Sequence, residues 1–168
     1  MNPALLNKEV QDYLEQHYKE DISRILFRGS PFPEVSVQEL GAQLSGKRKA
    51  EKKFPEFFNT RDIVYPPTLN LEQTSSEVTA EYKASLVNGD TLIDLTGGLG
   101  IDSFYFSKKL KKVVHCELNP ELSEIAAHNF QVLEANNLST FQGDGISYLE
   151  SSSENFDWIN VDPSRRDE

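Results

Sequence analysis

The chain has 168 residues, 38% of them hydrophobic, which suffices for one domain or for one domain with a small appendage. No apolar run approaches the roughly 18–20 residues of a membrane span, and the first residues lack the basic segment and apolar core of a signal peptide, so we expect a cytoplasmic protein without membrane contact. The single cysteine, Cys116, excludes an internal disulfide, and three scattered histidines give no metal-ligand spacing, so we expect no metal site.

The net charge of −10 is unevenly distributed. Residues 1–70 contain ten Lys and Arg against ten Asp and Glu, whereas residues 71–168 contain seven against seventeen. Phosphate affinity comes largely from Lys and Arg, so the acidic second part is a poor candidate for broad nucleic-acid binding, while the first part remains eligible. The contrast predicts two units, one over residues 1–70 and one over residues 71–168.

Helical spacing and caps characterise residues 1–70. The apolar pattern of residues 6–18 predicts a first helix. Asp21 is placed to cap a short second helix, and Ser36 with Glu39 forms a capping box for a third. We expect the third helix to end near Gly46, because glycine is a weak helix former.

The segment KRKAEKKFPEFF, residues 47–58, combines five basic residues with three phenylalanines. Basic residues interleaved with aromatic ones can hold a phosphate backbone and stack bases, which makes RNA a candidate partner. The alternative, which we favour, is a solvated helix end whose phenylalanines dock the helical region onto the rest of the chain.

Residues 71–168 alternate between helical and extended apolar patterns. Residues 74–77 form a capping box for a helix that ends near Gly89. Strands are predicted at 91–96, 113–118, near 140–143 and at 157–162, and helices are predicted at 101–112, 120–135 and near 146–150. Strict alternation of this kind predicts an α/β fold with a parallel sheet and right-handed crossovers.

A glycine-rich turn follows the first of these strands. Such a turn lets the backbone approach a nucleotide closely. Residues 98–103 fail the dinucleotide fingerprint G-x-G-x-x-G/A at its third small position, Ser103. Glu117, at the tip of the second strand, could take both ribose hydroxyls in an NAD or an S-adenosylmethionine site.

Two further features discriminate between these cofactors. Asp94 lies in the first strand, three residues before the glycines, and a buried carboxylate there needs hydrogen bonds or a cationic neighbour. S-adenosylmethionine carries a sulfonium and an α-ammonium group, and NADH carries neither. Asp162 and Pro163 follow the fourth strand, at the crevice where open α/β sheets bind ligands.

The order of these motifs resembles class I S-adenosylmethionine-dependent methyltransferases. The resemblance rests on DLTGGLG at 94–100, CELNP at 116–120, AAHN at 126–129, GDG at 143–145 and VDPSRR at 161–166. Together with LEQTSSEVTAEYKASL at 71–86 and the KKFPEFF segment, it extends to a bacterial group in which a THUMP-like domain, a module associated with RNA binding, follows the methyltransferase domain. It implies a Rossmann-like sheet, S-adenosyl-L-methionine as the cofactor and RNA as the substrate.

The resemblance also implies roles for individual residues. The amino-acid end of the cofactor would be held by Asp94, Thr96, Gly97, Gly98 and Gly100. Glu117 would take the ribose hydroxyls and Asp144 the adenine amino group, although Asp144 could equally be a simple turn residue. We expect His115 and Cys116 to be packing residues rather than ligands or nucleophiles.

Residues 162–166, DPSRR, correspond to the (Asp/Asn)-Pro-Pro-aromatic motif of enzymes that methylate exocyclic amines of bases. Asp162 and Pro163 match this motif, and Ser164 and Arg165 depart from it. Asp162 would position the acceptor amine. Arg165 and Arg166 could bind a phosphate or pair with the acidic residues that follow.

These observations predict a methyltransferase acting on RNA. The alternatives are a non-catalytic cofactor-binding fragment, a methyltransferase acting on protein or a small molecule, and an NAD-linked oxidoreductase. A complete class I sheet has about seven strands, and four are predicted here in the order 3-2-1-4, so we expect an N-terminal piece of a longer enzyme. The fourth strand would have an uncovered edge, which predicts self-association.

Overall fold

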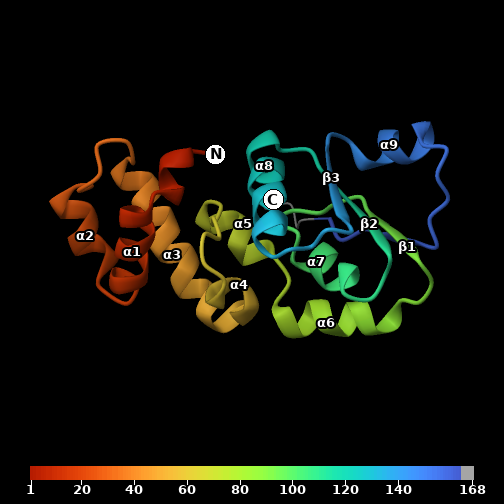
Figure 1. Ribbon diagram of the computed structural model, residues 1–168, viewed down its shortest axis with the longest axis horizontal. Coiled ribbons are helices and arrows are strands. Elements are labelled where there is room, and N and C mark those ends of the chain that lie inside the picture. Colours follow the sequence, from red (N-terminus) through yellow and green to blue (C-terminus); the bar gives the residue numbers. More distant parts are fainter. Residues whose placement is uncertain (164–168) are drawn as a thin grey trace, which may run out of the picture.

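The computed structural model describes residues 1–163, except the side chains of residues 68–70, and divides into a helical region and a sheet with its own helices (Figure 1). The helical region contains a 3₁₀ helix, Pro3–Leu6, followed by α1 Lys8–His17, α2 Ile22–Arg28, α3 Val37–Lys53, α4 Pro55–Asn59 and α5 Thr68–Gln73. The second part contains α6 Glu77–Leu86, β1 Thr91–Asp94, α7 Ile101–Ser107, β2 Lys112–Glu117, α8 Pro120–Val132, β3 Leu138–Gln142, α9 Gly145–Ser151 and β4 Trp158–Asn160.

The four strands form one sheet in the order β3-β2-β1-β4, and every pairing is parallel. This confirms the predicted α/β class and strand order. Alternate residues of the strands face opposite sides: Leu92 and Val113 join the main core, whereas Ile93, Val114 and Cys116 form a smaller cluster with side chains that include those of α9. The sheet therefore has helices on both faces, as buried parallel strands require.

The capping signals in the helical region are largely as predicted. Asp21 accepts a hydrogen bond from the Ser23 amide at 3.0 Å, and Ser36 with Glu39 forms the capping box of α3. The prediction that α3 ends near Gly46 is wrong, because the helix continues to Lys53. A Cβ atom at Gly46 would lie 2.3 Å from Cβ of Tyr65, so the glycine serves close packing and does not terminate the helix.

The positions of the phenylalanines in the 47–58 segment bear on whether they stack on bases or dock the helical region onto the rest of the chain. Phe54 and Phe57 are fully buried, and the ring of Phe57 meets the ring of Phe104 on α7 edge to face at 5.4 Å. Their role in docking the helical region is confirmed, and these two rings are not available to stack on bases. The RNA contact stays a prediction, which now depends on the basic side chains and on Phe58, which is only partly buried.

One apolar core runs from the helical region into the sheet part. Asn129 of α8 reinforces the contact, since its side chain accepts from the amide of Val64 and donates to the carbonyl of Val64, both at 2.9 Å. The division at residue 70 stays a prediction, and that position falls inside α5.

The outer edge of β4 has no neighbouring strand among the described residues, and Ile159 and Val161 nearby are exposed. Self-association through this edge stays a prediction. Within residues 1–163, no helix combines the length and hydropathy needed to cross a bilayer.

Two glycines of α3 provide a test of the packing. We expect Gly46→Ala to lower the free energy of unfolding by about 2–3 kcal/mol, because the added methyl group collides with the buried Tyr65. Urea unfolding followed by circular dichroism measures this value. Gly41→Ala is the matched control: its Cβ would meet only Cδ2 of Leu26 at 2.7 Å, and Leu26 is 39% exposed and can move. A change of at most about 1 kcal/mol is expected there, and equal losses in both variants would contradict the packing role of Gly46.

Candidate functional site

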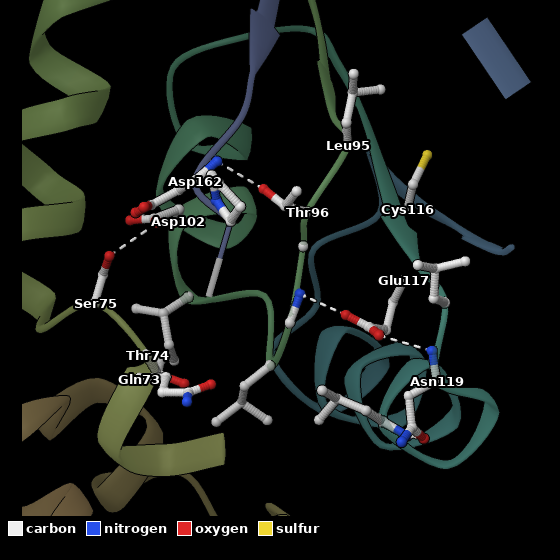
Figure 2. Close-up of a pocket in the computed structure, with 17 residues that line it drawn as sticks. Gln73, Thr74, Ser75, Leu95, Thr96, Asp102, Cys116, Glu117, Asn119 and Asp162 are labelled. Atoms are coloured by element: carbon white, nitrogen blue, oxygen red, sulfur yellow. Dashed lines mark hydrogen bonds between the residues drawn. The ribbon is translucent and has the colours of Figure 1, made fainter. Parts of the chain in front are cut away.

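A cavity of about 470 Å³ lies at the carboxyl ends of β1, β2 and β4 (Figure 2). Its walls are the glycine turn after β1, residues 95–99, and the end of β2 with the residues that follow, 116–119. Residues 73–75, which connect α5 to α6, and residues 162 and 163 after β4 close the other side. Ligands of open α/β sheets bind in such a crevice.

The glycine turn passes closely over the side chains of β2 and α8. A Cβ atom at Gly97 would lie 2.2 Å from the ring of His115, and one at Gly100, where φ is +86°, would lie 2.2 Å from Phe130. Gly98, with φ of +57°, faces open space on the cavity side. The backbone of the turn, without side chains at its glycines, thus forms this wall of the cavity.

His115 supports this turn from below. Its side chain is fully buried, and Nε2 lies 3.1 Å from the carbonyl oxygen of Gly98, a contact in which Nε2–H donates. The ring also meets Phe130 edge to face at 5.3 Å. His115 is therefore a packing residue, as predicted from the sequence.

Asp94 lies beneath the turn and is 1% exposed. One carboxylate oxygen accepts from the Thr96 amide at 3.2 Å and the other from the Ser103 hydroxyl at 2.7 Å. Burial raises the pKa of Asp94, and His115 together with these hydrogen bonds partly opposes that rise. Ser103 occupies the third small position of the turn, and its hydroxyl explains why serine stands there instead of glycine or alanine.

Glu117 is held in a defined position at the end of β2. Its two carboxylate oxygens accept from the amides of Gly98 at 2.9 Å and Asn119 at 2.7 Å (Figure 2). Each carboxylate oxygen can accept a further hydrogen bond. Glu117 therefore lines the cavity with accepting capacity left for a ligand.

Asp162 lies on the opposite wall of the cavity. Its amide donates to Oγ1 of Thr96 at 2.7 Å, and its Oδ2 atom accepts from Nζ of Lys83 at 2.6 Å. The same ammonium group donates to Oδ2 of Asp102 at 2.8 Å and to Oγ of Ser75 at 3.1 Å. Burial by itself would lower the pKa of Lys83, but the hydrogen bonds to Asp102 and Asp162 outweigh burial and raise it, so this lysine stays charged.

Sequence reasoning did not identify Lys83, Asp102 or Ser75 as site residues. The predicted capping box at 74–77 is also wrong, because Ser76 caps α6 by accepting from the Thr79 amide. Ser75 lies outside the helix, where it donates to Asp102 at 2.9 Å. The resemblance at residues 71–86 was the sequence signal that included Ser75 and Lys83, and it did not single them out from their neighbours.

The remaining predicted site residues differ in their placement. Asp144 is exposed and caps α9 by accepting from the Ser147 amide at 2.9 Å, and it is not among the residues that line the cavity. Its contact with adenine stays a prediction. Pro163 lines the cavity, and Ser164 and Arg165 lie outside the described residues.

Cys116 also lines the cavity, with a thiol that is not activated. Burial, with smaller contributions from Asp94 and Asp144, raises the pKa of the thiol to about 12, so it stays protonated near neutral pH. In the part of the chain that the structure describes, no three His, Cys, Asp or Glu side chains gather as a metal site would require.

Known proteins resemble this chain in fold and sequence. No protein-family profile matches it. A solved structure from Porphyromonas gingivalis W83, of a protein classed as a methyltransferase, gives a TM-score of 0.70 at 27% identity and covers 86% of this chain and 37% of that one. A structure from Klebsiella pneumoniae, classed as an O-methyltransferase, gives a TM-score of 0.51 at 15% identity and covers 92% and 60%.

A sequence relative adds to these structural matches. An uncharacterised RNA methyltransferase of Mycoplasma mobile is 32% identical over 77 residues, which are 46% of this chain and 21% of that protein. This chain thus spans 37% of the Porphyromonas chain and 21% of the Mycoplasma protein. Together the matches indicate a methyltransferase fold of the class I type.

The buried charge of Asp94 predicts a specific pH dependence of stability. The pKa of Asp94 is raised in the folded state, so the unfolded chain loses this proton first as pH rises above the ordinary value of 3.8. The free energy of unfolding therefore falls with rising pH from 3.8 up to the raised pKa, and the loss remains at higher pH. Asp94→Asn keeps an acceptor for Thr96 and can donate to Ser103. We expect this variant to be more stable than the parent chain at pH 7, and the difference to vanish towards pH 4, in urea titrations at both pH values.

Asp157 provides a control because its pKa is shifted in the opposite direction. Its exposed carboxylate accepts from the amides of Asp90 and Thr91, which lowers its pKa. Asp157→Asn should therefore lose stability at pH 7, and this loss should shrink as pH falls through the lowered pKa. A less stable Asp94→Asn at pH 7 would contradict the dominance of burial at Asp94.

Proposed function

We propose that this chain binds S-adenosyl-L-methionine in the cavity described above and forms part of a methyltransferase that acts on RNA. The observation that carries the proposal is the joint placement of the glycine turn, the Glu117 carboxylate and Asp162 with Pro163 on one cavity. The class I methyltransferase fold supports the same conclusion.

The residues of the cavity fit this cofactor. Glu117 has acceptor capacity for two ribose hydroxyls, and Gly98 leaves the space that any side chain would fill. At the other wall, Asp102 lines the cavity with a side chain that is 13% exposed and adds a carboxylate beside Asp162. Asp102 and Asp162 share the single ammonium group of Lys83, and the resulting net negative charge of this wall favours a cationic ligand over NADH.

Alignment is the main requirement of the chemistry. The cofactor, when bound, supplies a methyl group on a sulfonium ion that already carries its leaving group. Asp162 is held by Thr96 and Lys83, yet its side chain is 57% exposed, so it can accept a hydrogen bond from an acceptor amine and take its proton. Pro163 would offer its carbonyl oxygen to the same amine, as the resemblance implies.

RNA as the acceptor is supported by the Mycoplasma relative and by the basic side chains near the end of α3. Lys19, Arg48, Lys49, Lys52 and Lys53 surround a groove that also contains Glu51 and Glu72. Their excess of positive charge suits a phosphate backbone. Methylation of a base exocyclic amine is the reaction we propose, because Asp162 and Pro163 are the residues that such enzymes use.

Calorimetric titration of the 168-residue chain tests the cofactor. We expect S-adenosylhomocysteine to bind in the micromolar range and NADH not to bind. Glu117→Gln should weaken the binding of S-adenosylhomocysteine about tenfold, because a charge-assisted hydrogen bond to the ribose is lost. Glu121→Ala, an exposed acidic residue outside the cavity, serves as the control and should bind as the parent chain does. Binding of NADH without S-adenosylhomocysteine would favour an oxidoreductase instead.

Removal of two lysines tests the RNA contact. We expect Lys49→Gln with Lys52→Gln to reduce the affinity for a fluorescent single-stranded RNA and to lower the slope of log K against log salt by about 1–2. Fluorescence anisotropy at several salt concentrations measures both quantities. Lys111→Gln with Lys112→Gln changes the charge equally near the start of β2, away from the groove, and should leave both unchanged. The same loss in both pairs would indicate a general charge effect.

A further inference from the structure

Asp102, in the first turn of α7, has a carboxylate that is stabilised on one side only. Its Oδ2 atom accepts from the Ser75 hydroxyl at 2.9 Å and from the Lys83 ammonium at 2.8 Å. Its Oδ1 atom is shielded from solvent and has no hydrogen-bond donor among the described residues. Buried polar atoms are nearly always paired, so an unpaired carboxylate oxygen needs an explanation.

This carboxylate belongs to the cavity. Asp102 is a lining residue whose side chain is 13% exposed, and the part that is exposed is not the shielded Oδ1 atom. Figure 2 shows Asp102 beside Asp162, on the other side of the glycine turn from Glu117. If Glu117 holds the ribose, Asp102 lies towards the amino-acid end of the cofactor.

The charges on this wall leave room for a cation. Asp102 and Asp162 share the single ammonium group of Lys83, so the three side chains carry a net charge of −1. A ligand group that carries a positive charge and donates hydrogen bonds to the exposed part of this wall would balance this charge. The α-ammonium group of an amino acid has both properties.

Asp94 is less suited to the same contact. Its two oxygens already accept from Thr96 and Ser103, and it lies beneath the turn without lining the cavity. It supports the turn from below, whereas Asp102 lines the cavity.

We propose that Asp102 binds the α-ammonium group of S-adenosyl-L-methionine, with Lys83 as its counter-ion. The proposal rests on the proposed function and assigns the recognition of the amino-acid end to a residue of α7. Lys83 and Ser75 act as positioning residues, because they fix Oδ2 and thereby fix the orientation of the carboxylate.

Ligands that differ only in the amino group test this assignment by calorimetry. S-adenosylhomocysteine carries the α-ammonium group, and its deaminated analogue, S-adenosyl-4-thiobutyrate, keeps the carboxylate and lacks the amine. We expect the parent chain to prefer S-adenosylhomocysteine by about 10–100-fold, the range of a charge-assisted hydrogen bond. In Asp102→Asn this preference should fall to about threefold or less, while the affinity for the analogue stays nearly unchanged.

Controls separate this contact from general effects. Asp12→Asn removes an ion-paired carboxylate in the helical region and should keep the full preference. If Asp102→Asn does not fold, as judged by circular dichroism, the double variant Asp102→Asn with Lys83→Met removes both charges of the pair and should show the same loss. An unchanged preference in the folded Asp102 variant overturns the assignment, and so does a loss found in Asp94→Asn alone. Failure of both ligands to bind the parent chain would instead overturn the proposed function itself.

Discussion

The buried carboxylate of Asp94 is the constraint around which the site is arranged. A carboxyl group that is 1% exposed requires hydrogen-bond partners from its surroundings. The Thr96 amide and the Ser103 hydroxyl supply them, so the chain must turn sharply after β1 and return α7 over the strand end. That path brings the turn so close to His115 and Phe130 that only glycines fit at 97 and 100. The hydrogen bonds of this one buried carboxyl group and the close packing of the two glycines thus occur in the same turn.

The helical region is part of the same arrangement. The connection between α5 and α6 forms a cavity wall, and Lys83 of α6 holds both Asp102 and Asp162. Contacts such as Phe57 with Phe104 place these elements against the sheet part, and the apolar core is continuous across them. Segments on both sides of β1 in the sequence therefore shape the site together, although the composition of the chain suggests two separate units.

The sequence was sufficient for features that depend on local pattern, and insufficient for those that depend on tertiary neighbours. Buried strands, the alternation with helices and the glycine turn are encoded in short windows, which is why the class could be predicted. The strand order was predicted from the resemblance to class I methyltransferases. The end of α3 could not be predicted, because Gly46 accommodates Tyr65 from a distant segment. The contacts of Ser75 and Lys83 with Asp102 depend on the packing of α6 against α7. The ion pair of Lys83 with Asp162 depends in addition on where the chain leaves β4.

Three carboxylates, those of Asp102, Glu117 and Asp162, line the cavity, and Asp94 lies beneath the turn. Lys83 compensates two of the lining carboxylates, and Glu117 relies on backbone amides. Because Asp102 and Asp162 share one ammonium group, a net charge of −1 remains on that wall of the cavity. A ligand that carries positive charge would balance this charge only in the folded state, and its binding would then stabilise the fold by linkage. The acidity of the second half of the chain is therefore not only a surface property, because three of its carboxylates line the cavity at the strand ends.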